Sequence, residues 1–326
     1  MKTIKIILGI ILITFCNIRA QHDTVIFYPD RGEYEISYWT NIAGVDTFMT
    51  VIFIPSNKVI PKIEYRIKKK MRDFIYSYKI TNLSESKMPL ETFALLIDTL
   101  INYRDLTAND WSKDDTEKVY NGRHTWFGHY EEHTAYGDTE LKINQSKDGF
   151  IINSENLPGI GEAVFQGRTP WYTLSEEETS DFLDNVLDSL SSFPRNYVLR
   201  KTIVPVYISP TISNIDFLDT LKSYINQSFS LRWITDKKEK DDKEKEKSGE
   251  IVKELMKYLD KAREQLVKNK IKEAKKKLEE FVEKVEESYQ ENDKDEEKEK
   301  KERGYLTDEA YALLKYNAEY LISQIK

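Results

Sequence analysis

Three of the four histidines lie within one short segment, HTWFGHYEEH, as His124, His129 and His133. Two glutamates, Glu131 and Glu132, lie between the last two of them. Imidazole nitrogens and carboxylate oxygens are ligands that Zn²⁺ prefers, and three protein ligands with one open position make a catalytic zinc site. The spacing matches no HExxH-type motif, however, and on a strand the side chain at position 124 points away from the other two unless a bulge intervenes. The sequence leaves two interpretations open, a metal site or ordinary loop histidines, and it implies no other cofactor.

The tryptophans provide a second set of candidate binding residues. Trp111, Trp126 and Trp171 lie in expected loops or at expected strand ends. Indole rings that are exposed there can stack on sugar rings, which would make them a ligand-binding set. The alternative is that they pack beneath the loops, since large aromatic side chains are mostly buried.

No other catalytic motif stands out in the chain. A serine elbow of the form G-x-S-x-G is missing from the sequence, and the abundant carboxylates single out no pair with the spacing that a glycosidase requires. The one cysteine, Cys16, lies in the N-terminal apolar stretch, so the rest of the chain has no thiol for disulfides, nucleophilic catalysis or cysteine-ligated metal.

The N-terminus has the pattern of a secretory signal peptide over residues 1–20. Lys2 and Lys5 come before an apolar run at 6–15, and Ala20 provides a small residue at the expected cleavage position. Phe15 directly precedes Cys16, which argues against a lipoprotein signal. We therefore expect secretion to the periplasm or the extracellular space after cleavage near Ala20.

Charge and hydropathy restrict the class of partner. The net charge of −7 disfavours nucleic acid, because the phosphate backbone requires a basic surface. Beyond the signal, no apolar stretch is long enough to span a membrane. The remaining expected partners are a carbohydrate or a cell-surface protein, with self-association through the helical region as a further possibility.

Residues 21–210 are expected to form an antiparallel β-sandwich. The segment 73–81, DFIYSYKIT, alternates strictly between apolar and other residues, as a half-buried strand does. Further strands are expected at 34–39, 45–54, 64–67, 91–101, 140–144, 161–166 and 197–204. The glycines and Pro158 within 154–167 predict tight turns around a short strand, and a short helical insertion is expected near 176–190.

Residues 211–326 are expected to form an antiparallel bundle of three to four helices, so that the fold class is α+β multidomain. Apolar residues recur at helical spacing over 216–233, 249–268, 270–289 and 306–325. Two charged tracts, 236–247 and 291–303, lack the apolar residues that would order them. In the last helix, Asn317 interrupts the apolar face and is expected to be a buried amide bonded to a neighbouring helix.

The helical pattern resembles the FIMAH-type module, a C-terminal appendage of secreted bacterial proteins. The resemblance covers about 215–325 and rests on the opening LTDEAYALL of the last helix and on the run Ala262, Leu266, Asn269, Ala274, Leu278 and Phe281. It implies a helical module with no catalytic role of its own. The N-terminal part is similar, more loosely, to β-sandwich segments of secreted proteins.

Two functional hypotheses follow from the sequence. The first is a secreted, non-catalytic binding or scaffolding protein of the cell surface or extracellular space, with glycan binding through the β domain as one form of it. The second is a secreted hydrolase, metal-dependent in one version, that uses the 124–133 segment.

Overall fold

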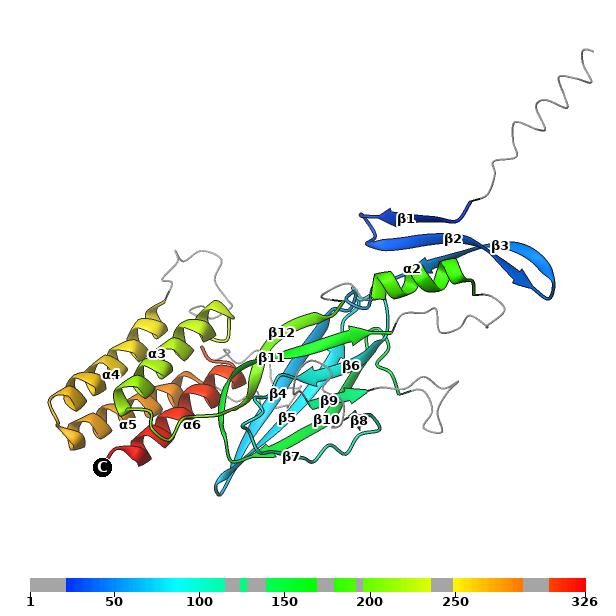
Figure 1. The fold of residues 1–326 in the computed structure, drawn as a ribbon. Helices are drawn as coiled ribbons and strands as arrows, with labels where there is room; N and C mark the ends of the chain where they lie inside the picture. Colours follow the sequence, from blue (N-terminus) through cyan, green and yellow to red (C-terminus); the bar gives the residue numbers. More distant parts are fainter. Residues whose placement is uncertain are drawn as a thin grey trace, which may run out of the picture. The chain divides into compact units, whose positions relative to one another are not determined.

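The computed structural model describes residues 22–114, 124–127, 139–168, 179–191, 196–235, 249–289 and 305–326. Three antiparallel sheets lie in the N-terminal two-thirds of this part of the chain, and the helices lie mostly at the C-terminus (Figure 1). The α+β fold class is therefore confirmed. The expected signal at 1–20 and the two charged tracts lie outside the described residues. The described residues divide into two compact units: unit 1 contains those up to Lys58 and those within Gly167–Tyr197, and unit 2 contains those within Val59–Gln166 and Val198–Lys326.

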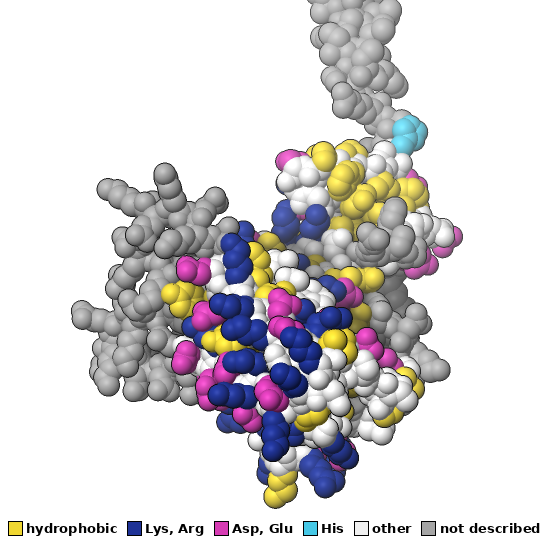
Figure 2. All heavy atoms as spheres, turned by 90° about the vertical axis from the view of Figure 1, so that its left-hand side faces the viewer, with side chains coloured by type: hydrophobic (Ala, Val, Ile, Leu, Met, Phe, Trp, Pro, Cys, Tyr) yellow, Lys and Arg dark blue, Asp and Glu magenta, His cyan; other side chains and the backbone are white. Residues whose placement is uncertain are grey.

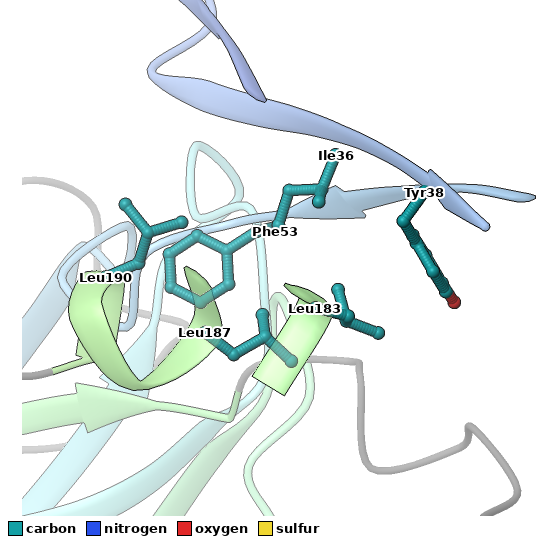
Figure 3. Close-up of a cluster of buried hydrophobic side chains, with 6 residues drawn as sticks. All are labelled: Ile36, Tyr38, Phe53, Leu183, Leu187 and Leu190. Carbon is teal, nitrogen blue, oxygen red and sulfur yellow. The ribbon is translucent and has the colours of Figure 1, made fainter. Parts of the chain in front are cut away.

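Unit 1 is a three-stranded sheet covered on one face by a helix. The strands are β1 (Thr24–Tyr28), β2 (Glu33–Ile42) and β3 (Val45–Phe53), in that spatial order, and the helix is α2 (Asp181–Ser191). Three leucines of α2 pack on three side chains of β2 and β3 (Figure 3); the cluster is Ile36, Tyr38, Phe53, Leu183, Leu187 and Leu190. The predicted helical insertion is thus present from Asp181 onward, where the Ser180 hydroxyl accepts from the Leu183 N–H at 3.2 Å.

Unit 2 begins with a β-sandwich of two antiparallel sheets. The strands of the first sheet lie in the order β4 (Pro61–Lys70), β5 (Asp73–Asn82), β10 (Ser146–Ser154) and β7 (Arg104–Asp105). Those of the second sheet lie in the order β12 (Val198–Val206), β11 (Leu157–Gly167), β6 (Leu90–Leu95), β9 (His124–Phe127) and β8 (Ser112–Asp114). The Phe93 ring of β6 lies 6.0 Å from that of Tyr78 on β5 and 5.2 Å from that of Phe150 on β10. These aromatic contacts join the two sheets through one core.

The strict alternation of apolar residues predicts β5 correctly. Where a bulge interrupts the alternation, as in β10, the predicted strand is in the wrong place. Four residues of the predicted apolar face, Phe74, Tyr76, Tyr78 and Ile80, are all at most 3% exposed. The predicted strand at 140–144 is wrong, since Leu141 forms only an isolated bridge with Leu90. The strand lies instead at β10, where the register shifts between Lys147 and Phe150 and Gly149 has a φ of +84°. A β-bulge there resembles a turn in the sequence.

The tight turns predicted at Pro158, Gly159 and Gly161 are wrong, because Leu157–Gly167 is one continuous strand, β11. This strand contains the one predicted at 161–166. Its glycines leave room for valines of the neighbouring strand β12. A Cβ at Gly159 would lie 2.3 Å from Val206 Cγ1, and one at Gly161 would lie 2.4 Å from Val204 Cγ2. These glycines permit close packing between the two strands. Such close approach is one of the few reasons for glycine in the interior of a strand.

Four helices complete unit 2: α3 (Asn214–Ser230), α4 (Glu250–Val267), α5 (Ile271–Ser288) and α6 (Asp308–Gln324). All four predicted helices are confirmed, with ends shifted by a few residues. Asn269, at a φ of +54°, forms the short turn between α4 and α5, and Lys284 of α5 pairs with Glu254 of α4 at 3.1 Å, as antiparallel neighbours do. None of the helices in the described part of the chain is both long and apolar enough to cross a membrane.

Helix α6 joins the bundle to the sandwich. Its predicted apolar face is buried throughout, from Leu306 at 4% exposure to Ile325 at 0%. Asn317 is the buried amide that the sequence predicts, but its partner is a strand rather than a neighbouring helix: Nδ2 donates to Pro158 O of β11 at 2.8 Å and to Leu313 O of α6 at 2.7 Å. The bundle is therefore anchored on the end of the second sheet.

We expect Gly159→Ala to lower the free energy of unfolding by about 1–3 kcal/mol, because the added methyl group overlaps Val206. Val206→Ala in the same chain should recover part of this loss. The measurement is urea unfolding of the two single variants and the double variant as a cycle. Strictly additive losses would show that the two positions do not compete for space.

We expect Asn317→Asp to destabilise unit 2 by about 3 kcal/mol or more at pH 7, because a buried carboxylate would face two carbonyl oxygens. Burial raises the folded-state pKa of the introduced carboxyl above its unfolded value of about 3.9, so the loss should grow as pH rises from about 4 and shrink below it. Chemical unfolding at pH 4 and pH 7 measures this difference. The exposed Asn226→Asp is the matched control, and an equal effect in both variants would contradict the account.

Candidate functional site

The two predicted tryptophans whose side chains are described belong to the sandwich core. Trp126 is fully buried, and its ring stacks on Phe93 at 4.9 Å with an interplanar angle of 15°. Trp111 is 3% exposed, and its Nε1–H donates to Thr139 O at 2.6 Å. Both therefore show the packed arrangement that the sequence left as the alternative, and neither ring offers a face to a ligand. Trp171 lies outside the described residues.

The histidine segment is described only in part. His124 is the first residue of β9, where its backbone pairs with Leu95 of β6. His129 and His133 lie outside the described residues, together with Glu131 and Glu132. Among the residues that the structure does describe, no group of three or more His, Cys, Asp or Glu is placed to hold a metal ion. The metal site at His124, His129 and His133 remains a prediction.

A groove in unit 2 brings together side chains that the sequence analysis did not single out. It is a hollow of about 270 Å³ where β4 meets α6 and the end of α5. One side is formed by β4 and the other by the helices; the lining residues are Arg66, Ile67, Lys68, Tyr289, Asp308, Tyr311, Ala312 and Tyr316. We call this hollow the β4–α6 groove. Because a strand and two packed helices provide its walls, its shape depends on the core of unit 2.

Two of the groove's tyrosines hold each other in place. The rings of Tyr289 and Tyr311 are stacked at 4.0 Å with an angle of 17°, and the Tyr289 hydroxyl donates to Asp308 Oδ1 at 3.0 Å. Lys315 Nζ donates to the Tyr311 hydroxyl at 2.9 Å and to Glu286 Oε1 at 2.5 Å. These contacts fix the two rings before any ligand arrives, which lowers the entropy that binding must overcome.

The third tyrosine closes the groove against the first sheet. Tyr316 of α6 lies with its ring 5.3 Å from that of Phe74 on β5, and its hydroxyl lies 3.5 Å from Ile67 O on β4. Nearby, Lys69 of β4 pairs with Glu319 of α6 at 3.0 Å. The strand and the helix are thus joined on the same side as the groove.

The strand wall contributes positive charge that the described residues leave unpaired. Arg66 and Lys68 are both exposed, and neither forms a hydrogen bond or ion pair through its side chain with any described residue. The opposite wall carries the Asp308 carboxylate, already bonded to Tyr289. The groove therefore presents two free cations, one partly engaged anion and aromatic surface.

Burial and neighbouring charges shift the pKa of several groups around the groove. Burial raises the pKa of Glu309 above its ordinary value of 4.5, and the charges of Asp308 and Glu64 add to this effect. Burial alone would lower the pKa of Lys315, but its hydrogen bonds to Glu286 and Tyr311 outweigh burial and hold it well above the usual range. Lys315 thus remains a fixed cation at neutral pH.

A larger depression between α3 and α4 is a weaker candidate. It measures about 470 Å³ and is lined mainly by charged residues, including Asp219, Lys222, Asp260 and Arg263. These charges already pair with one another: Lys222 Nζ lies 2.5 Å from Asp260 Oδ1, and Arg263 Nε lies 3.6 Å from Asp219 Oδ1. Figure 2 shows the same mixture on the face it displays, with Lys and Arg interspersed among Asp and Glu. Mutually paired surface charges leave little for a ligand to gain.

An exposed tryptophan in unit 1, packed beside a half-buried phenylalanine, is a separate candidate. Trp39 of β2 is 42% exposed, and its ring lies 5.2 Å from that of Phe48 on β3. By strand alternation it points to the sheet face opposite the one that α2 covers. Trp39 was not among the candidates from the sequence, although the predicted strand 34–39 ends at it. The observed strand β2 continues to Ile42, so Trp39 lies inside a strand rather than at its end.

Comparison with known proteins gives no family for this chain. No protein-family model matches it, and no curated protein matches it. Among solved structures, it is similar to a protein from Nocardia farcinica with an immunoglobulin-like fold, at 9% identity and a TM-score of 0.25, over 46% of this chain and 98% of that one. A likeness at this level adds no argument, and the sandwich described above rests on its own sheets.

We expect Glu309→Gln to stabilise unit 2 at pH 7 by an amount on the order of 1 kcal/mol. The folded state holds the Glu309 proton more tightly than the unfolded state, so the stability of the natural chain falls as pH rises through 4.5 toward the raised folded-state pKa. Glutamine has no such titration, and the gain should vanish below pH 4.5. Chemical unfolding between pH 4 and pH 8 measures it, with the exposed Glu283→Gln as control. A gain that is independent of pH would contradict this cause.

Proposed function

We propose that the chain is a secreted, non-catalytic binding or scaffolding protein that acts at the cell surface or in the extracellular space. The observation that carries the proposal is the β4–α6 groove, in which oriented tyrosines and unpaired cations converge on one hollow. Side chains fixed by packing on strands and helices make precise binding sites. The sequence supports the location, because residues 1–20 have the pattern of a secretory signal.

The helical part has a supporting role in this proposal. Helices α3 to α6 form a FIMAH-type module in our interpretation, on the strength of the residues that carry that resemblance. The run from Ala262 to Phe281 forms the α4–turn–α5 pair, and the LTDEAYALL segment opens α6. In this chain the module would supply one wall of the binding groove rather than a separate activity.

The proposed partner is a glycan or a cell-surface protein, and the groove takes the place of the tryptophans as the expected contact. The rings of Trp111 and Trp126 are buried, whereas Tyr289, Tyr311 and Tyr316 are partly exposed around the hollow. Tyrosine suits such a site because its ring is rigid and its hydroxyl can donate or accept a hydrogen bond.

The test is binding of the secreted chain, residues 21–326, to a panel of glycans, cell-wall polysaccharides and surface peptides. We expect at least one class to bind, and Tyr289→Ala to weaken that binding by about tenfold or more, as removal of a central aromatic contact does. Tyr207→Ala, at a tyrosine that is 46% exposed and outside the groove, is the matched control.

Two outcomes would contradict the proposal in different ways. Binding lost in Trp39→Ala but kept in Tyr289→Ala would move the site to the sheet of unit 1. Conversion of any panel member into products by the purified chain would make the protein an enzyme. Thermal unfolding of each variant shows that the fold is retained.

A further inference from the structure

We infer that the β4–α6 groove and the adjoining β4–β5 hairpin bind an acidic polysaccharide, a polymer of sugars that carry carboxylate or sulfate groups. This inference rests on the proposed function and specifies its ligand. It depends on three observations: the charge of the hairpin, the row in which its cations stand, and the mixed chemistry of the groove beside them.

The hairpin concentrates positive charge in a chain whose net charge is −7. Five cations lie within residues 66–72, and all five are exposed: Arg66, Lys68, Lys69, Lys70 and Arg72. Among the described residues, only Lys69 of these five forms an ion pair, with Glu319. Four unpaired cations so close together attract an anionic ligand and raise its rate of association.

Three of the cations stand in a row at the open edge of the first sheet. Arg66, Lys68 and Lys70 alternate along β4, so they share one face of the strand at spacings of about 7 Å. In the spatial order β4-β5-β10-β7, β4 is the edge strand. Lysines on an edge strand also prevent it from pairing with a second chain, which alone could explain why these cations are there. That explanation does not account for the tyrosine-lined hollow that Arg66 and Lys68 also line.

The groove favours a sugar over an acidic peptide. Its hydroxyl and carboxylate groups, from Tyr289, Tyr311 and Asp308, can bond to the many hydroxyl groups of a sugar, and its aromatic surface suits the apolar face of a sugar ring. A peptide rich in carboxylates would supply no hydroxyl donors for the Asp308 carboxylate. One sugar residue in the hollow would leave the rest of the polymer along the row of cations.

An anionic membrane is the remaining competitor. Met71, at the hairpin turn, is 92% exposed, so a single apolar side chain projects among the cations. Attraction to a lipid surface would use the hairpin but would not require the tyrosines, which lie in the groove. The requirement for Tyr289 therefore separates the two ligands.

The test measures binding of the chain, residues 21–326, to soluble polygalacturonate and to a sulfated glycan, with dextran as the neutral polymer. Polyglutamate and vesicles with anionic phospholipid are the competing probes. We expect polygalacturonate or the sulfated glycan to bind, with an affinity that falls as salt is raised. The double variant Arg66→Glu, Lys68→Glu should weaken this binding more than tenfold, and Tyr289→Ala should also weaken it.

The control variant is Lys253→Glu, Lys257→Glu, which makes the same change in net charge at exposed positions of α4. It should bind as the natural chain does, and circular dichroism should show that both double variants are folded. Equal loss in the control and the groove variant would reduce the effect to net charge and overturn the inference.

The remaining outcomes separate this inference from the proposed function. Polyglutamate or vesicles that bind as tightly as the acidic glycans would overturn the inference and assign the site to a peptide or a membrane surface. A neutral glycan whose binding is lost in Tyr289→Ala but kept in Arg66→Glu, Lys68→Glu would overturn it while the proposed function stands. No binding of any probe that depends on the groove would overturn both.

Discussion

Asn317 lies in the middle of the helix that joins the bundle to the sandwich, and its side-chain amide donates to Pro158 of β11 and to Leu313 of its own helix. Around it, Leu313, Leu314 and other apolar residues of α6 are fully buried. A shift of α6 along β11 would leave the buried Pro158 carbonyl without its donor, which costs free energy. The Asn317 amide therefore favours one position of α6 on this strand. The apolar contacts supply most of the stability, and the amide specifies the position.

The candidate site is a consequence of this docking. Tyr311 and Tyr316 lie on the same helix as Asn317, and they reach the first sheet only because α6 is held between the bundle and the sandwich. The Lys69–Glu319 ion pair adds little energy on an exposed surface, but it lies where strand and helix meet. A change in the register of α6 would therefore alter the groove and the core together.

The sequence predicts the helices and strands whose pattern of residues is contained within the element itself. The prediction fails where a residue is explained by another element that packs against it. Helical periodicity located all four C-terminal helices, and strict alternation located β5. The glycines of β11 were misread because their purpose, space for Val204 and Val206, lies in another strand. The groove could not be predicted for the same reason: Tyr316 and Ile67 are separated by 249 residues, and only tertiary packing brings them together. The basic run at 66–72 is local in the sequence, but it was not singled out, because nothing near it in the sequence indicates the tyrosines beside which it folds.

That basic run shows why net charge alone is a poor guide to the ligand. A total of −7 disfavours nucleic acid for the chain as a whole, yet charges interact over only about 8–10 Å at physiological ionic strength. The hairpin segment 66–72 contains five cations and no carboxylate, whereas Glu64, Asp73, Asp308 and Glu319 lie at its borders. The local sign is therefore positive. The tyrosines then decide which anion fits, because charge attracts any polyanion whereas aromatic and hydroxyl groups distinguish a sugar from the rest.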